Sequence, residues 1–153
     1  MGRMKNAEKK TSERHRSYKK PVLSSEAFAR ARREAKLRLV GSGGLRSLFG
    51  QAAKKVASLP RRRFKENWLY LQTMLRLIGA YERGQYKQVS NDELLWIVAA
   101  LNYLVDPYDL IPDLTPVLGL VDDAIVVEFV LDKTRQALDD FMVWETSGVS
   151  NPR

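Results

Sequence analysis

The chain has 153 residues, enough for one modest domain with a tail, and 44% of them are apolar. It has no cysteine and a single histidine, His15, which excludes disulfides, thiolate chemistry, Cys-based zinc sites and His-dependent triads. Residues 1–65 hold 20 Lys and Arg against 4 Asp and Glu, whereas residues 66–153 hold 6 against 14, for a net charge of +8. This asymmetry favours contact with an anionic surface, or an arm that its charge keeps soluble and that folds back on the acidic half.

The N-terminal third is expected to be a tail followed by a basic arm. Residues 1–23 are polar, charged and without apolar periodicity, which predicts a disordered basic tail rather than a secretory signal. Residues 24–59 predict a basic helical arm of two helices joined by a flexible Gly/Ser link. The first helix is capped by Ser24 or Ser25, and Pro60 ends the second.

Residues 60–145 are expected to form a helical domain, which opens with a basic cluster. The cluster consists of Arg61, Arg62, Arg63 and Lys65. Together with the aromatic residues Phe64 and Trp68, these charges suit acidic lipid headgroups, and they also suit nucleic-acid phosphates. No helix-turn-helix, zinc-finger or RNA-recognition signature accompanies them. We therefore expect an anionic-surface site here, with a solvated helix start and nucleic-acid binding as the alternatives.

The next start signal is a capping box at Ser90 and Glu93, which predicts a helix running to about Val105. The longest uncharged run, Leu94–Val105, has 12 residues, fewer than the roughly 18–20 that a membrane span needs. No span is therefore expected.

A last helix is expected to begin near Asp122, with residues 146–153 as a flexible tail. The three tryptophans of the chain fall on apolar helical faces and predict core packing. The fold class is accordingly all-α, a small helical bundle with an apolar helical hairpin joined by an Asp/Pro-rich turn.

The joining segment, Tyr103–Asp123, carries five aspartates among prolines and aliphatic residues. Most of them can be explained as helix caps, with Gly119 in a left-handed turn and Asp122 and Asp123 opening the last helix. The alternative is a site for Mg²⁺ or Ca²⁺, because these ions prefer clustered carboxylates. Its ligands would be Asp109, Asp113, Asp122 and Asp123. The EF-hand spacing is absent, so we favour capping and expect no cofactor apart from such a divalent cation.

The stretch "YLVDPYDLIPDLTPVLGLVDDAIVV" resembles the YkvA-like family, a bacterial and archaeal domain of unknown function. The positions that fall on the family pattern are Pro107, Asp109, Leu110, Ile111, Pro112, Asp113, Pro116, Gly119, Asp122 and Asp123. Two positions depart from it: Asp106, where serine is common, and Thr115, where a larger apolar residue is common. The resemblance covers roughly residues 90–131. It implies a small helical hairpin without an assigned catalytic activity, for which a membrane location is often suspected.

These observations predict a non-enzymatic helical module in the cytoplasm, at the inner face of the cell membrane, with a basic N-terminal arm that binds an anionic surface. Its expected partner is an anionic membrane surface or a membrane protein. Two alternatives stay open: a nucleic-acid-associated protein that uses residues 1–65, and a carboxylate-metal enzyme built on the aspartates.

Overall fold

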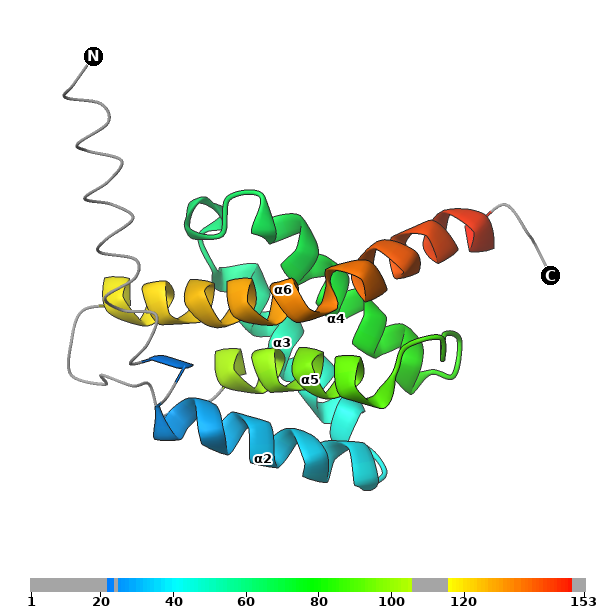
Figure 1. Ribbon diagram of the computed structural model, residues 1–153, viewed down its shortest axis with the longest axis horizontal. Helices are drawn as coiled ribbons and strands as arrows, with labels where there is room; N and C mark the ends of the chain where they lie inside the picture. The colour runs from blue at the N-terminus through cyan, green and yellow to red at the C-terminus, as the bar shows by residue number, and fades with distance from the viewer. Residues whose placement is uncertain (1–21, 24, 106–115, 150–153) are drawn as a thin grey trace, which may run out of the picture.

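The computed structural model describes residues 22–23, 25–105 and 116–149, and for residues 116–122 and 148–149 the description is confined to the backbone. Within these residues the regular elements are all helical, which confirms the all-α class (Figure 1). In chain order they are α2 (Glu26–Val40), α3 (Gly44–Ser58), the 3₁₀ turn η1 (Arg61–Arg63), α4 (Asn67–Glu82), α5 (Asn91–Val105) and α6 (Pro116–Val149).

Helix α5 is the central element, because it contacts α2, α3, α4 and α6. Its start is the predicted capping box: Ser90 Oγ accepts from the Glu93 amide at 3.1 Å, and Glu93 Oε1 accepts from the Ser90 amide at 3.1 Å. Every residue from Ile97 to Leu104 is buried. A helix that is apolar all round is stable only when neighbours cover it on several sides, and four helices do so here.

Helix α2 packs along α5 at the lower edge of Figure 1. Its N-cap is Ser25, one of the two serines predicted as candidates, with Oγ accepting from the Phe28 amide at 3.1 Å. Its buried stripe is narrow and rich in alanine: Ala27, Phe28, Ala31 and Ala35. The side chain of Asn102 on α5 donates to the Ala31 carbonyl at 3.2 Å. The hydrophobic core therefore extends across the domain boundary expected at residue 60, because it includes this short buried stripe of α2.

The Gly/Ser stretch between α2 and α3 is a tight turn, not the flexible link that its composition predicts. Gly43 has φ +83°, a left-handed conformation that glycine adopts without steric cost. A Cβ on Gly44 would lie 2.7 Å from the Arg38 carbonyl oxygen. The Arg38 side chain donates to the Gly44 carbonyl at 3.0 Å and closes the turn.

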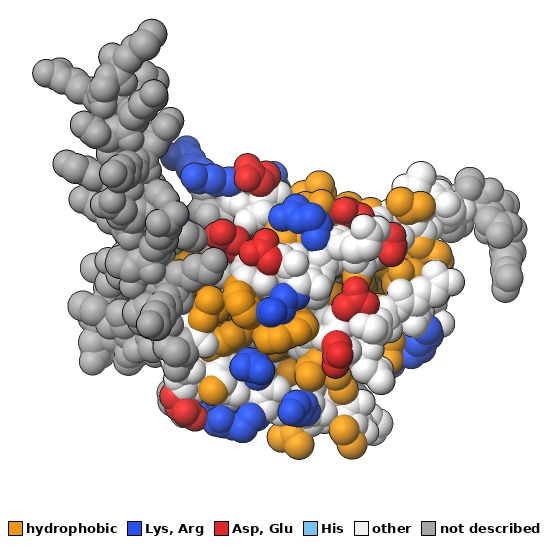
Figure 2. Space-filling view, in the orientation of Figure 1, with side chains coloured by type: hydrophobic (Ala, Val, Ile, Leu, Met, Phe, Trp, Pro, Cys, Tyr) orange, Lys and Arg blue, Asp and Glu red, His pale blue; other side chains and the backbone are white. Residues whose placement is uncertain are grey.

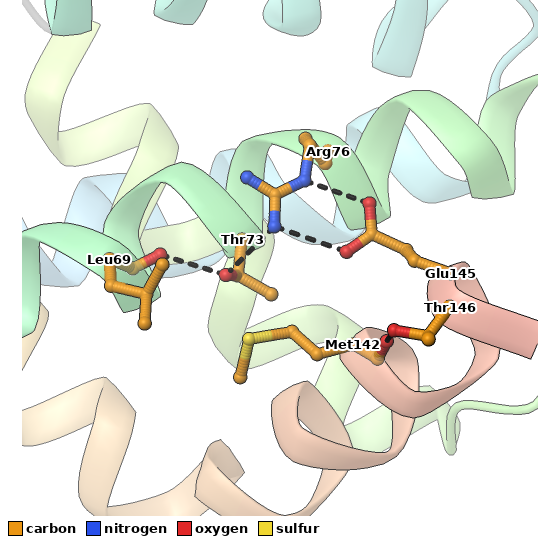
Figure 3. Close-up of polar contacts among 6 residues, drawn as sticks. All are labelled: Leu69, Thr73, Arg76, Met142, Glu145 and Thr146. Atoms are coloured by element: carbon orange, nitrogen blue, oxygen red, sulfur yellow. Dashed lines mark hydrogen bonds and ion pairs between the residues drawn. The ribbon is translucent and has the colours of Figure 1, made fainter.

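Helix α4 is tied to the C-terminal part of α6 by a paired arginine, shown in Figure 3. Arg76 Nε and Nη2 donate to the two carboxylate oxygens of Glu145 at 2.8 and 3.1 Å, and Nη2 also reaches Thr73 Oγ1 at 3.3 Å. Tyr70 donates to Asp139, which lies six residues before Glu145 on α6, at 2.8 Å. Two-point pairing of this kind fixes the orientation of the two helices more firmly than a single contact does.

Helix α6 begins at Pro116, so the start predicted near Asp122 is wrong. Proline suits the first helical position because it has no amide proton to leave unpaired. The predicted left-handed turn at Gly119 is also wrong, since the helix runs through it, and a helical glycine costs only about 1 kcal/mol relative to alanine. At its other end α6 continues to Val149, into the segment expected as a tail, and Thr146 Oγ1 donates to the Met142 carbonyl at 3.1 Å.

Candidate functional site

The aspartates of the family motif are only partly within the described residues. Asp109 and Asp113 lie outside them, as do the motif residues Pro107, Leu110, Ile111 and Pro112, and the side chain of Asp122 is not described. Asp122 and Asp123 are the seventh and eighth residues of α6, so the prediction that they open this helix is wrong. The side chain of Asp123 is buried, with 6% of its surface exposed.

The predicted divalent-cation site stays a prediction. Over residues 22–23, 25–105 and 116–149, no group of three or more His, Cys, Asp or Glu side chains is arranged to hold a metal ion. Three of the four proposed ligands have no described side chain. Because Asp123 is buried, its carboxylate needs polar partners; an unpaired carboxylate inside a protein would lower the stability of the fold.

The predicted basic cluster forms a protruding turn, called here the basic turn and defined by Arg61, Arg62, Arg63 and Lys65. All four side chains are exposed, and none forms an ion pair with a described residue. Phe64, at 2% exposure, anchors the turn in the core, and Lys65 has φ +51°. The three arginines form a 3₁₀ turn ahead of α4, which starts at Asn67. They therefore do not occupy the first turn of that helix, where its dipole would oppose them.

A second basic surface surrounds a pocket of about 510 Å³ between α2 and α5, called here the α2–α5 pocket. One wall is the α2 side chains Ala29, Arg32, Arg33 and Lys36, and the other is the α5 side chains Asp92, Leu95, Trp96 and Ala99. Figure 2 shows Lys and Arg side chains gathered along the lower edge of the molecule, where Figure 1 places α2. The pocket thus combines a cationic rim with an apolar and aromatic floor.

The charges around this pocket are mostly uncompensated. Arg33 pairs with Glu26 at 2.7 Å, and this hydrogen bond and the arginine charge hold the pKa of Glu26 below its usual value. Arg32 and Lys36 form no ion pair in the described chain. Lys133 on α6 is not part of the pocket lining but contacts the ring of Trp96, which is.

The ring of Trp96 is contacted by cations from two helices, α2 and α6. The Arg32 guanidinium carbon and the Lys133 Nζ each lie 5.0 Å from the centre of the Trp96 ring. Lys133 Nζ is also 4.9 Å from the centre of the Phe129 ring. An aromatic face attracts one cation by about 0.5–1 kcal/mol at an exposed site, but two cations on one ring also repel each other.

Sequence reasoning did not identify this second surface. The tryptophans were predicted to pack in the core, and all three are partly buried and packed against it. Trp96 differs from the other two because it also lines the pocket. The spacing of Arg32 and Lys36 is a visible signal, since i and i+4 share a helix face. No sequence pattern could have brought Lys133 to them, because it arrives through the packing of α6.

Large apolar side chains are exposed near both basic surfaces. On α2, Leu37 is 72% exposed and Val40 is 87% exposed. Leu69, in the first turn of α4 after the basic turn, is 52% exposed. Among the helices that the structure describes, none combines the length and the apolar character required to cross a bilayer.

Comparison with known proteins bears on this arrangement. The model of a family described as "Protein of unknown function (DUF1232)" matches residues 93–129, which include most of α5 and the first part of α6. The "Uncharacterized membrane protein YkvA" of Bacillus subtilis (strain 168) is 30% identical over 97 residues, covering 63% of this chain and 91% of the relative. No solved structure matches the chain.

The fold and these matches define an all-α protein of a family without an assigned activity, and the stretch matched by the family model includes most of the central helix α5. The chain belongs to the YkvA-like family, and the resemblance seen in its Asp/Pro segment is confirmed.

Proposed function

We propose that the chain is a non-enzymatic, membrane-peripheral helical module whose basic turn binds the anionic inner face of the cell membrane from the cytoplasmic side. The observation that carries this proposal is the basic turn itself: four exposed cations that form no ion pair within the described chain, held outward by a buried phenylalanine, Phe64. Each such cation near an anionic bilayer contributes about 1 kcal/mol to binding.

Two further features support a lipid surface over a solvated loop. Arg61 lies over the ring of Trp68 at 5.7 Å, so a partly buried tryptophan stands directly beside the charges. Leu69 follows in the next helix with 52% of its surface exposed. Basic residues beside aromatic and aliphatic side chains are typical of segments that rest at a membrane interface. The name of the Bacillus relative, a membrane protein, agrees with such a location.

The test is sedimentation of the full chain with vesicles of phosphatidylcholine alone and of phosphatidylcholine mixed with phosphatidylglycerol, in low and in high salt. We expect binding to the anionic vesicles only, weakened by salt because counterions screen the charges. The double substitution Arg62→Gln/Arg63→Gln should weaken binding by about 2 kcal/mol, or roughly 30-fold. Arg61 is left intact because it contacts Trp68.

A matched control removes the same charge from α3, where Lys54 and Lys55 are exposed and make no ion pair with described residues. Lys54→Gln/Lys55→Gln should bind nearly as the unchanged protein does. Equal losses in the two variants would show that only total charge matters and would overturn the assignment to the basic turn. Absence of binding to anionic vesicles would overturn the proposal as a whole.

The same titration with duplex DNA in place of vesicles tests the nucleic-acid alternative. Phosphate contacts of DNA would give a strong salt dependence as well, so the relative affinity at one salt concentration is the deciding quantity. Binding to DNA that is tighter than binding to anionic vesicles, and that is lost in Arg62→Gln/Arg63→Gln, would replace the membrane proposal with the nucleic-acid one.

A further inference from the structure

The α2–α5 pocket is not part of the basic turn. Figure 1 places the chain between α3 and α4 above α6 and places α2 below α5, so the two basic surfaces lie on opposite edges of this view. Substitutions that far apart and without shared partners act independently. The pocket can therefore be examined for a ligand of its own.

The charge of the pocket favours an anion. Arg32 and Lys36 on its rim have no carboxylate partner among the described residues, and Lys133 adds a third cation 5.0 Å from the centre of the Trp96 ring. Arg33 is already paired with Glu26. The guanidinium of Arg32 and the ammonium of Lys36, at i and i+4 on one face of α2, match the several oxygens of a phosphate, each as a charge-assisted donor.

Asp92 is the one acidic group among the described residues of the pocket wall. It stands on α5 opposite the α2 cations, where it is unfavourable to an anion but able to accept a hydrogen bond from a hydroxyl group. A ligand that carries a phosphate and a neighbouring hydroxyl satisfies both walls. Leu95, Trp96 and Ala99 provide an apolar floor for its carbon atoms.

The surface of α2 beside the pocket indicates where this ligand comes from. Arg33, Lys36, Leu37 and Val40 are spaced i, i+3, i+4 and i+7, so they lie along one stripe of the helix. The stripe changes from cationic to apolar, and its last two side chains are 72% and 87% exposed. Figure 2 shows hydrophobic and basic side chains next to one another along this edge.

The composition of the stripe fits a bilayer surface. Interfacial helices lie in the plane of the membrane surface and bury their apolar side chains about 5–10 Å into the boundary between headgroups and acyl chains. Leu37 and Val40 are one and four residues from Lys36 on this stripe, so a headgroup phosphate held at Lys36 leaves both side chains beside the bilayer.

We propose that the α2–α5 pocket binds the phosphate group of an anionic phospholipid, with Leu37 and Val40 inserted into the bilayer beside it. This inference rests on the proposed membrane association but uses a different surface. Phosphatidylglycerol has the required chemistry, since its headgroup carries a phosphate for Arg32 and Lys36 and hydroxyl groups for Asp92.

The first experiment measures vesicle binding of Arg32→Gln/Lys36→Gln beside the matched control Lys54→Gln/Lys55→Gln, with the full chain and phosphatidylglycerol vesicles. We expect the pocket variant to bind about 30-fold more weakly and the control to bind nearly unchanged. If the pocket variant binds like the control while Arg62→Gln/Arg63→Gln loses binding, the pocket inference fails and the proposed function stands. If neither pair matters, both fail.

The second experiment separates a lipid from a free phosphate ester. In the variant Trp68→Phe/Trp144→Phe, whose helicity is first checked by circular dichroism, Trp96 is the only remaining tryptophan and reports on the pocket by fluorescence. Vesicles should shift its emission, and Leu37→Gln/Val40→Gln should reduce their affinity several-fold. A response to sn-glycerol 3-phosphate as strong as to vesicles, unaffected by Leu37→Gln/Val40→Gln, would overturn the lipid as ligand. No Trp96 response to either would overturn the pocket as a site.

Discussion

Replacement of Asn102 by aspartate is the most direct test of whether α2 packs on α5. Asn102 is 2% exposed, and its Nδ2 donates to the carbonyl of Ala31 on α2 at 3.2 Å. Its Oδ1 is buried without a hydrogen-bond partner in the described part of the chain. Aspartate has nearly the same shape, but it replaces the amide donor by a carboxylate oxygen that faces the Ala31 carbonyl.

The magnitude follows from two effects. Loss of the hydrogen bond costs about 1 kcal/mol, and a buried charge without a partner raises the total to about 3–5 kcal/mol. Burial also raises the pKa of the introduced carboxyl group above its value in the unfolded chain. The protonated carboxyl group can donate to the Ala31 carbonyl, so the loss in free energy of unfolding should be small at low pH. This loss should grow as the pH rises through the interval between the unfolded and the folded pKa of the carboxyl group.

The assay is urea unfolding followed by helical circular dichroism, at about pH 8 and about pH 5. Asn102→Leu is the matched control, because it removes the hydrogen bond and the unpaired oxygen together; it should be as stable as the unchanged protein or up to about 2 kcal/mol more stable. If Asn102→Asp unfolds at the same urea concentration as the unchanged protein at about pH 8, α2 does not cover α5 in solution and the reasoning is refuted.

Two more predictions concern the start of α5 and the tyrosine near it. Ser90→Ala should lower the free energy of unfolding by about 1 kcal/mol, because it leaves the Glu93 amide without its cap; an unchanged urea midpoint would contradict this. Burial, and then the charges of Asp140 and Glu93, raise the pKa of Tyr86 above its usual value. The neutral form is thereby favoured in the folded state, so this contribution is complete below the unfolded pKa of about 10 and is lost as the pH rises through the folded one. Ultraviolet titration should show Tyr86 ionising late, and Tyr86→Phe should reduce the late part of the titration by one tyrosine; an unchanged late amplitude would contradict this prediction.

The local parts of this fold could be predicted from the sequence. Ser25 and Ser90 cap their helices as expected, because a cap is decided by a residue and the three that follow it. The first part of α6 could not be predicted, because proline, glycine and aspartate each fit a turn as well as a helix. The choice between these states depends on the rest of the fold, which the local sequence does not contain.

The two basic surfaces show the same limit. The arginines of the basic turn are consecutive in sequence, so their cluster was predicted, although their 3₁₀ conformation was not. The α2–α5 pocket joins side chains from two helices, with Lys133 of a third beside it, and it exists only once these helices have packed. The packing of α2 on α5 could not be predicted from the alanine-rich stripe of α2. Arginines surround this stripe, and its burial depends on the close approach of α5.

The pairing of α2 with α5 has a consequence for how the chain is made. Ala31 and Asn102, which meet through a hydrogen bond, are separated by 71 positions in the sequence. At about 5–20 residues per second, a ribosome synthesises α2 some 4–14 seconds before the helix that will cover it. During that interval the apolar stripe of α2 is not covered by α5 and could associate with other nascent chains. The narrow alanine stripe exposes little apolar surface during this interval, so it favours few incorrect contacts. The like charges that surround it also repel other copies of the same helix.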